Sequence, residues 1–443
     1  MPEGAVAAVR GFQIFDSRGW PTLAVEVELD SGESAWAEVP SGTSIGSREA
    51  RELRDGGRPF SGRGVMLAVQ KISEVVNPFL VGRLATQQSE IDSQLMALDG
   101  REDQSVLGAN TMLGVSMAVS KAAAQWLKIP LYRYLGQEHG VLPTPQFNVI
   151  NGGLHADSEI PVQEFLIIPG GAASFTDAMR MGVEVYHALK RRLSRVGYRT
   201  AVGDEGGFAP RMTGIHQVFD VLLESIVDAG LRPDQDVALG IDVAASALRQ
   251  EHRYRWGESV LAADETTYRW RESTLEADQL IDQYIDWIRQ YPLISIEDGL
   301  AEDDWSGWSM MTSLLGGRCQ IIGDDIFVTH RELLARGVRE QSANALIVKP
   351  NQIGTVTLAR DVAKFAASSG WNVVASSRSG ETCDTFLADF AVAVGAPEMK
   401  AGAPAQGERL AKYNRLLSLE AHDPSLNFAG WSWRKFPESR GSG

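Results

Sequence analysis

The sequence contains few cysteines, few histidines and no long hydrophobic run. Its 443 residues include only two cysteines, Cys319 and Cys383. One widely spaced pair provides neither the disulfide framework of a small secreted protein nor a cysteine-rich zinc site. The seven histidines stand singly, without the H-E-x-x-H spacing of a zinc-binding helix. We therefore expect a protein of the reducing cytoplasm, and oxygen ligands for any metal that it binds.

Positive charge is also scarce, which bears on the partners of the protein. Lys and Arg number 42 against 57 Asp and Glu, for a formal net charge of −15. Nucleic acids and anionic membranes are bound by clustered cations, so we expect neither partner. No segment approaches the roughly 18 apolar residues of a membrane span, and residues 1–10 do not resemble a signal peptide. A small anionic substrate held by a few local cations remains compatible with this composition.

The chain is longer than a single hydrophobic core usually supports, so we expect two domains. Apolar and other residues alternate over 23–29, the turn Asp30–Gly32 follows, and a second strand is expected over 35–39. Helical periodicity appears over 65–76 and again over 109–127. Residues 1–140 are therefore predicted to form an N-terminal α+β domain.

Residues 141–443 show a different pattern, in which short apolar runs alternate with amphipathic helices. The predicted strands are 165–168, 238–243, 293–296, 320–323, 345–348, 372–375 and 398–401, and the predicted helices include 175–196, 215–229, 281–290 and 356–368. This repetition predicts an eight-stranded α/β barrel. A doubly wound open sheet is the alternative, but no G-x-G-x-x-G follows an early strand.

Polar residues follow most of these predicted strands. They are Asp242, Glu297, Asp324, Lys349, Ser377 with Arg378, and Lys400. The carboxyl ends of barrel strands converge on one mouth, where such enzymes carry out their chemistry. Three carboxylates gathered there form a hard-oxygen site suited to Mg²⁺. The alternative is that each acidic residue only solvates the end of its strand.

Two lysines belong to the same predicted mouth. Lys349 follows a buried strand, and burial beside a metal ion favours its neutral amine, the form that a general base needs. A simple ion pair with one of the carboxylates explains Lys349 equally well. Lys400 fits either a substrate carboxylate or a structural ion pair. Glycine-rich loops at 41–46, 151–155 and 203–207 add polar groups, although each loop alone is weak evidence.

Taken together, these segments resemble the enolase family. The matching stretches are 15–19, 39–42, 108–110, 151–153, 163–165, 203–210, 294–305, 323–325, 349 with 351–355, 378–382 and 402–404, and they span almost the entire chain. The resemblance implies a two-domain, Mg²⁺-dependent enzyme, active as a homodimer or larger homo-oligomer. Its substrate would be the small phosphorylated carboxylate 2-phosphoglycerate, and its product phosphoenolpyruvate.

The resemblance also implies roles for individual residues. Asp242, Glu297 and Asp324 would hold a first Mg²⁺, and Ser44 would help to hold a second. Lys349 would remove the α-proton, while Glu205, assisted by Glu164, would protonate the departing hydroxyl. The remaining substrate contacts would come from Lys400 at the carboxylate, from His155, Arg378 and Ser379 at the phosphate, and from Gln163 and Ser377.

Four departures from the family pattern shape the functional hypothesis. Ser377 stands where the family has His, Ile45 replaces Thr, Trp20 replaces Asn, and Gln406-Gly407 replaces Arg-Ser. Two of them lie at the substrate end of the site, while the predicted metal ligands and Lys349 are kept.

Our first hypothesis is therefore a specialised paralogue that resembles the carboxyphosphonoenolpyruvate synthases of phosphonate and phosphinate antibiotic pathways. Such an enzyme takes an activated phosphonate as a second substrate. The alternatives are an ordinary phosphopyruvate hydratase and a non-catalytic binding protein on an enolase scaffold. The retained charged residues count against the scaffold.

Overall fold

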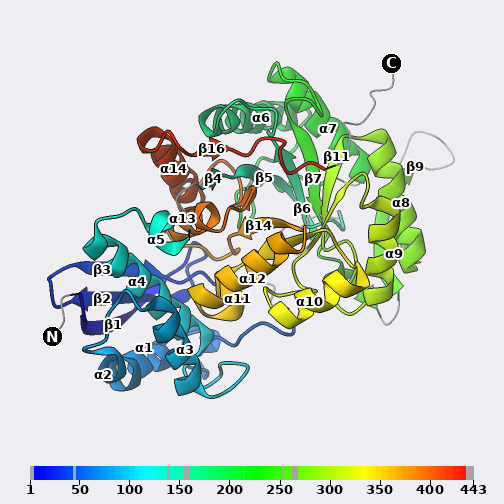
Figure 1. The fold of residues 1–443 in the computed structure, drawn as a ribbon. Coiled ribbons are helices and arrows are strands. Elements are labelled where there is room, and N and C mark those ends of the chain that lie inside the picture. Colours follow the sequence, from blue (N-terminus) through cyan, green and yellow to red (C-terminus); the bar gives the residue numbers. More distant parts are fainter. Residues whose placement is uncertain are drawn as a thin grey trace.

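The structure is a computed structural model that describes residues 4–42, 46–136, 140–153, 160–212, 214–250, 253–261 and 268–435, without the side chains of 258–261 and 268–272. An N-terminal sheet with its helices lies beside a larger barrel ringed by helices (Figure 1). No helix of the described residues is long and apolar enough to cross a membrane.

The N-terminal part is built on a three-stranded antiparallel sheet of β1 (Val6–Phe15), β2 (Pro21–Leu29) and β3 (Ser34–Glu38). The helix α4 (Ala109–Leu127) packs on β2 and β3. A Cβ at Gly114 of α4 would lie 2.6 Å from Val25, so the missing side chain permits this close approach. The smaller helices are α1 (Met66–Lys71), α2 (Asn77–Leu80), α3 (Gln88–Asp99) and α5 (Leu131–Leu135).

The barrel confirms the predicted fold class, because eight strands form one closed sheet. In barrel order they are β5 (Thr144–Asn151), β6 (Glu164–Ile168), β7 (Ala238–Asp242), β11 (Leu293–Glu297), β12 (Gln320–Gly323), β13 (Ala345–Val348), β14 (Asn372–Ser376) and β15 (Glu398–Lys400). The one barrel strand that the sequence pattern did not predict is β5. Its Pro145, Gln146 and Asn148 interrupt the apolar pattern, yet all three are buried in the barrel.

The regular strand–helix repetition that we predicted is wrong for the first three barrel strands. Strand β6 pairs antiparallel with both β5 and β7, and the helices α6 (Phe175–Arg195) and α7 (Ile215–Asp228) both lie between β6 and β7 in the chain. Because β6 runs in the opposite direction, its first residue lies at the mouth of the barrel. Glu164 is accordingly level with Asp242, the last residue of β7.

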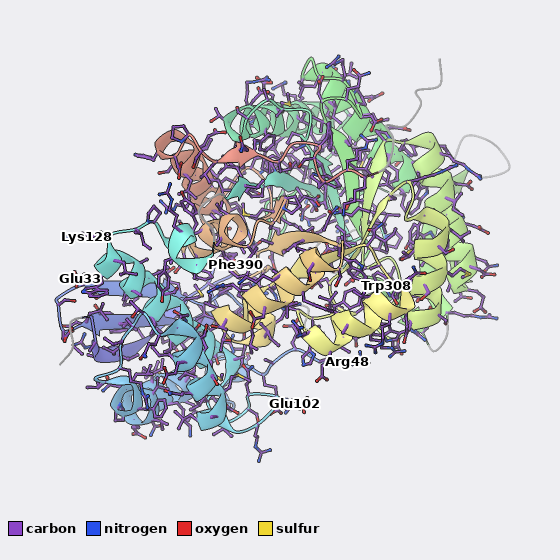
Figure 2. The ribbon with its side chains drawn as sticks, viewed as in Figure 1. Glu33, Arg48, Glu102, Lys128, Trp308 and Phe390 are labelled. Carbon is purple, nitrogen blue, oxygen red and sulfur yellow. The ribbon has the colours of Figure 1, made fainter. Side chains whose placement is uncertain are left out.

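The other helices form the outer layer of the barrel (Figure 1). They are α8 (Ala277–Gln290), α9 (Trp305–Leu315), α10 (Arg331–Glu340), α12 (Val356–Ser368), α13 (Phe386–Ala393) and α14 (Gly407–His422), with the single turn α11 (Pro350–Ile353). The helix α13 contacts α5 of the N-terminal part, and its Phe390 is fully buried there (Figure 2). Short strands β4 (Val141–Leu142) and β16 (Asn427–Phe428) pair together, as do β8 (Arg249–Gln250), β9 (Arg253–Leu261) and β10 (Tyr268–Leu275).

The barrel interior contains a buried carboxyl group, that of Glu398 on β15. Its side chain is 0% exposed, and its two oxygens accept hydrogen bonds from the amide groups of Gln146 and Gln320, both at 2.6 Å. Burial raises the pKa of Glu398 from 4.5 to about 8, although the two amide hydrogen bonds act in the opposite direction. The folded protein therefore holds a proton on Glu398 at neutral pH.

This proton makes the stability of the protein depend on pH. Between the unfolded pKa of 4.5 and the folded pKa of about 8, the unfolded chain has lost a proton that the folded protein keeps. The free energy of unfolding therefore falls as pH rises through this window. The variant Glu398→Gln lacks the effect, because it replaces the carboxyl group with a non-titrating amide of similar shape. Relative to the wild type, we expect the free energy of unfolding of this variant to increase by roughly 3 kcal/mol from pH 5 to pH 8. Melting temperatures of both proteins measured across this pH range would show the change. A difference that is constant with pH would contradict this assignment.

Candidate active site

The predicted functional residues come together at the mouth of the barrel. Asp242, Glu297 and Lys400 are the last residues of β7, β11 and β15, whereas Asp324, Lys349 and Ser377 come directly after β12, β13 and β14. A pocket with about 440 Å³ of empty volume lies there. Its lining includes Gln163, Glu164, Glu205, Asp242, Asp324, Lys349, Ser377, Arg378, Ser379 and Lys400. Ser44, Ile45 and His155 lie outside the described residues.

The ammonium group of Lys400 is held by three carboxylates. Its Nζ lies 2.8 Å from Asp242, 2.8 Å from Glu297 and 3.1 Å from Glu164. Burial lowers the pKa of Lys400, but the carboxylates, Asp242 first, outweigh it and raise the pKa well above its ordinary value. Of the two interpretations drawn from the sequence, the structure shows the ion pair. Lys400 is a fixed positive charge at the centre of the acidic mouth.

Lys349 is also paired with a carboxylate. Its Nζ donates to Asp324, whose other oxygen accepts a hydrogen bond of 2.9 Å from Gln352. Burial lowers the pKa of Lys349, but Asp324 reverses the effect, and the pKa is raised above its ordinary value. The neutral amine expected from burial is therefore not the form that this arrangement favours. The charge on Asp324 is what keeps the proton on Lys349.

The mouth holds an excess of buried carboxylates. The pKa of Glu297 is raised well above its ordinary value by burial and by Asp242, and the pKa of Asp325 is raised to about 7 by burial and by Asp324. Glu297 Oε1 is buried and accepts no hydrogen bond from the described part of the chain. Crowded oxygen ligands and an orphaned carboxylate oxygen fit a divalent cation such as Mg²⁺.

The structure adds two acidic residues that the predicted ligand set lacks. One carboxylate oxygen from each of Asp298, Asp324 and Asp325 lies within 4.8 Å of the others. Asp298 also accepts the backbone N–H groups of Asp324 at 2.9 Å and Asp325 at 3.0 Å, so it fixes the loop after β12. Asp298 and Asp325 each directly follow a predicted ligand in the sequence, and this adjacency could have been used to predict them.

Glu205 lies in the glycine-rich turn that connects α6 and α7. Gly206 has a φ of +86°, which favours glycine, and its carbonyl accepts a hydrogen bond of 2.7 Å from Tyr186. The carbonyl of Glu205 accepts the N–H of Ala403 at 2.8 Å. Glu205 and Glu164 are both buried, at 6% and 1% exposure. The turn is therefore anchored to the barrel, with the Glu205 side chain in the pocket.

Residues of the N-terminal part contact the side of the pocket that is predicted to bind phosphate. Arg378 is paired with Glu49, at 2.8 Å and 3.2 Å, and both side chains are almost fully buried. Burial lowers the pKa of Arg378, but Glu49 outweighs it and raises the pKa. Ser379 accepts a hydrogen bond of 3.3 Å from Arg18. No sequence pattern predicted a role for Arg18 or Glu49. The segment that carries Glu49 also includes Arg48 and reaches from the N-terminal part to the barrel (Figure 2).

The departures from the family pattern fall in different places. Trp20 is not among the described residues that line the pocket, and its ring lies 4.5 Å from the guanidinium of Arg63. Gln406, at the start of α14, lies beside the Glu205 turn, because a Cβ at Gly206 would be 3.0 Å from its Oε1. Ser377 lines the pocket itself.

The fold and the site together are those of an α/β-barrel enzyme, with acidic residues suited to a metal ion at the mouth of the barrel. The model of the enolase C-terminal TIM barrel domain matches residues 139–435, and that of the enolase N-terminal domain matches residues 6–135. The chain belongs to the enolase family, whose members are Mg²⁺-dependent hydro-lyases, and it is an enzyme of this kind.

Two named relatives match nearly the full length. An enolase of Acidothermus cellulolyticus is 47% identical over 427 residues, which cover 96% of each chain. An enolase of Nitratiruptor sp. is 46% identical over 411 residues, or 92% of this chain and 94% of the relative.

Proposed function

We propose that the protein is an ordinary phosphopyruvate hydratase, which interconverts 2-phosphoglycerate with phosphoenolpyruvate and water. The observation that carries this proposal is the meeting of Lys349, Lys400 and the buried carboxylates in one pocket at the barrel mouth. Both relatives described above are named enolase. They favour the ordinary reaction over the specialised phosphonate-pathway enzyme that was our first hypothesis, which no comparison supports.

The chemistry requires a base and an acid on the two sides of the substrate. Lys349 would have to be the neutral amine, which requires that the charge of Asp324 be taken up by a metal ion; it then takes the proton from the carbon next to the carboxylate. Glu205, with Glu164 beside it, gives a proton to the departing hydroxyl. Asp242, Glu297 and Asp324 would hold Mg²⁺, and Ser44 would contribute to a second ion. When bound, Mg²⁺ stabilises the negative charge that develops on the substrate carboxylate. Lys400 adds a fixed positive charge on the same side.

Arg378 and Ser379 are proposed to contact the phosphate, together with His155. Gln163 lines the same pocket. The protein is further proposed to be a cytoplasmic homodimer or larger homo-oligomer. Phe12 and Trp36, exposed by 37% and 41%, pack against each other on the outer face of the N-terminal sheet and provide apolar surface for such contacts.

The direct test is formation of phosphoenolpyruvate from 2-phosphoglycerate with Mg²⁺. We expect a turnover of roughly 10–100 s⁻¹, in the middle of the usual range, and its loss on chelation by EDTA. Exchange of the α-proton with solvent, measured in parallel, separates the alternatives. Exchange without significant elimination would favour a specialised enzyme, whereas neither exchange nor elimination would favour a non-catalytic scaffold.

A further inference from the structure

A surface cavity of about 450 Å³ lies just after the end of α6. This volume is in the range of small-molecule sites. Two arginines and a tyrosine supply its chemistry, and the other residues that line it are small. The lining residues are Gly197, Tyr198, Arg199, Ala201, Ala209 and Arg211. None of these six is among the described residues that line the pocket at the barrel mouth, so the two sites are separate.

The cavity lies at the base of the hairpin that carries Glu205 at its tip. The first arm of this hairpin is 201–203 and the second arm is 207–209. The two arms are joined by backbone hydrogen bonds, including one of 2.9 Å from the N–H of Ala209 to the carbonyl of Ala201. Both of these alanines line the cavity. The cavity is therefore continuous with the base of the segment that places Glu205 in the active-site pocket.

The two arginines of the cavity belong to opposite arms of the hairpin. Arg199 precedes the first arm, and Arg211 follows the second arm. The second arm is also attached to the barrel, because Phe208 donates to the carbonyl of Val149 on β5 at 2.9 Å. A molecule bound between the two guanidinium groups would therefore connect the outer arm to the arm that is attached to the barrel.

Arg199 is an exposed cation that forms no hydrogen bond or ion pair with the described part of the chain. This is unexpected in a protein with a net charge of −15. Arg180, which is exposed on α6, instead pairs with two carboxylates of its own helix, at 2.7 Å and 2.6 Å. Cations in the last turn of a helix offset its dipole, which explains Arg195 but not Arg199, four residues beyond the helix end. The charge of Arg199 is therefore available to an anion in the cavity.

The lining residues indicate the kind of ligand that the cavity would bind. Guanidinium groups bind phosphate oxygens in pairs, through parallel N–H donors. Tyr198 is half-buried against the hydrophobic core and lines the same cavity, so it offers an aromatic surface to a flat ring. A molecule that combines a phosphate group with a flat ring uses both features.

We propose that this cavity is a binding site for a nucleoside phosphate, with the phosphate between Arg199 and Arg211 and the base against Tyr198. The site is separate from the active-site pocket and does not depend on the proposed hydratase function. Because residues from both arms line the cavity, a bound nucleotide restrains the backbone of 201–209.

The test is calorimetric titration of the full-length protein with adenosine 5′-monophosphate in the presence of Mg²⁺. We expect saturable binding whose affinity is unchanged after equilibration with 2-phosphoglycerate. The variant Arg199→Gln should weaken it about 10-fold, through the loss of charge-assisted hydrogen bonds. Tyr198→Leu should weaken it at least about fivefold, through the loss of stacking. The matched control Arg180→Gln should stay within about twofold of the wild type.

Two further measurements complete the test. Melting curves verify that each variant is folded. Hydrogen exchange of the backbone amides of 201–209 should slow when adenosine 5′-monophosphate is bound to the wild type, and this slowing should be lost in Arg199→Gln. Neither measurement requires turnover.

Adenosine and inorganic phosphate, titrated separately, resolve the two parts of the ligand. Both should bind more weakly than adenosine 5′-monophosphate. Adenosine that binds equally well would overturn the role of the phosphate, and inorganic phosphate that binds equally well would overturn the role of the ring. Absence of saturable binding would overturn the site itself. Displacement of the nucleotide by 2-phosphoglycerate, with unchanged affinity in Arg199→Gln, would do so too, because the nucleotide would then occupy the active-site pocket.

Discussion

Replacing Lys349 by Met is expected to reduce phosphoenolpyruvate formation by about 10⁴-fold, the upper range for the loss of a general base. The α-proton should also stop exchanging with solvent, because no other lysine is described as lining the pocket on the Asp324 side. Met approximates the length of the stem, so the barrel packing around β13 should persist. Methionine carries no group that takes up a proton.

The matched control for this variant is Lys364→Met. Lys364 is exposed on α12, outside the residues that line the pocket. Its loss should leave the turnover within about twofold of the wild type, as is usual for surface substitutions. Persistent exchange in Lys349→Met would show that another group removes the proton, and the assignment of the base would have to be abandoned.

A second large effect is expected at Asp242. Its carboxylate belongs to the ligand set inferred from the family, with Glu297 and Asp324, whereas Asp325 belongs to the cluster with Asp298 and Asp324. We expect Asp242→Asn to raise the Mg²⁺ concentration for half-maximal activity by at least about 100-fold. This bound follows because residues that only orient metal ligands already contribute 10- to 100-fold. Isothermal titration with Mg²⁺ measures the same loss without turnover.

Asp325→Asn provides the comparison, because it removes a buried carboxylate from the same mouth. If Asp242 is a ligand and Asp325 is not, the Asp325 variant should bind Mg²⁺ with clearly smaller loss than the Asp242 variant. The reverse order would assign the ion to the cluster after β11 and β12. Equally small losses of Mg²⁺ affinity in both variants would show that neither set of carboxylates is the binding site.

The sequence predicted those parts of the fold in which local pattern and packing agree. The helix at 109–127 and the strands at 320–323 and 345–348 have the predicted boundaries. The direction of β6 could not be predicted, because its alternation of side chains is the same in parallel and antiparallel pairing. Strand β5 was missed because Gln146 and Asn148 point into a polar barrel interior, where a buried strand is not uniformly apolar.

The site residues that were predicted best are those at the last position of a barrel strand. Asp242, Glu297 and Lys400 are of this kind, and their strands bring them together as expected. Contacts between the N-terminal part and the barrel could not be predicted from the sequence. Glu49 and Arg378 are separated by 329 positions, and neither carries a local signal of the other. The charge state of Lys349 was open for a similar reason, since it depends on how close Asp324 lies.

The ion pair between Glu49 and Arg378 has a consequence for how this enzyme can change over evolutionary time. At one end of the pocket, the guanidinium of Arg378 in the barrel is neutralised by the carboxylate of Glu49 in the N-terminal part. A barrel transplanted onto a foreign N-terminal unit would expose an uncompensated buried cation unless the new unit supplied an equivalent carboxylate. The N-terminal part and the barrel are therefore expected to evolve together, because a substitution at one member of this ion pair is tolerated only if the other part compensates for it.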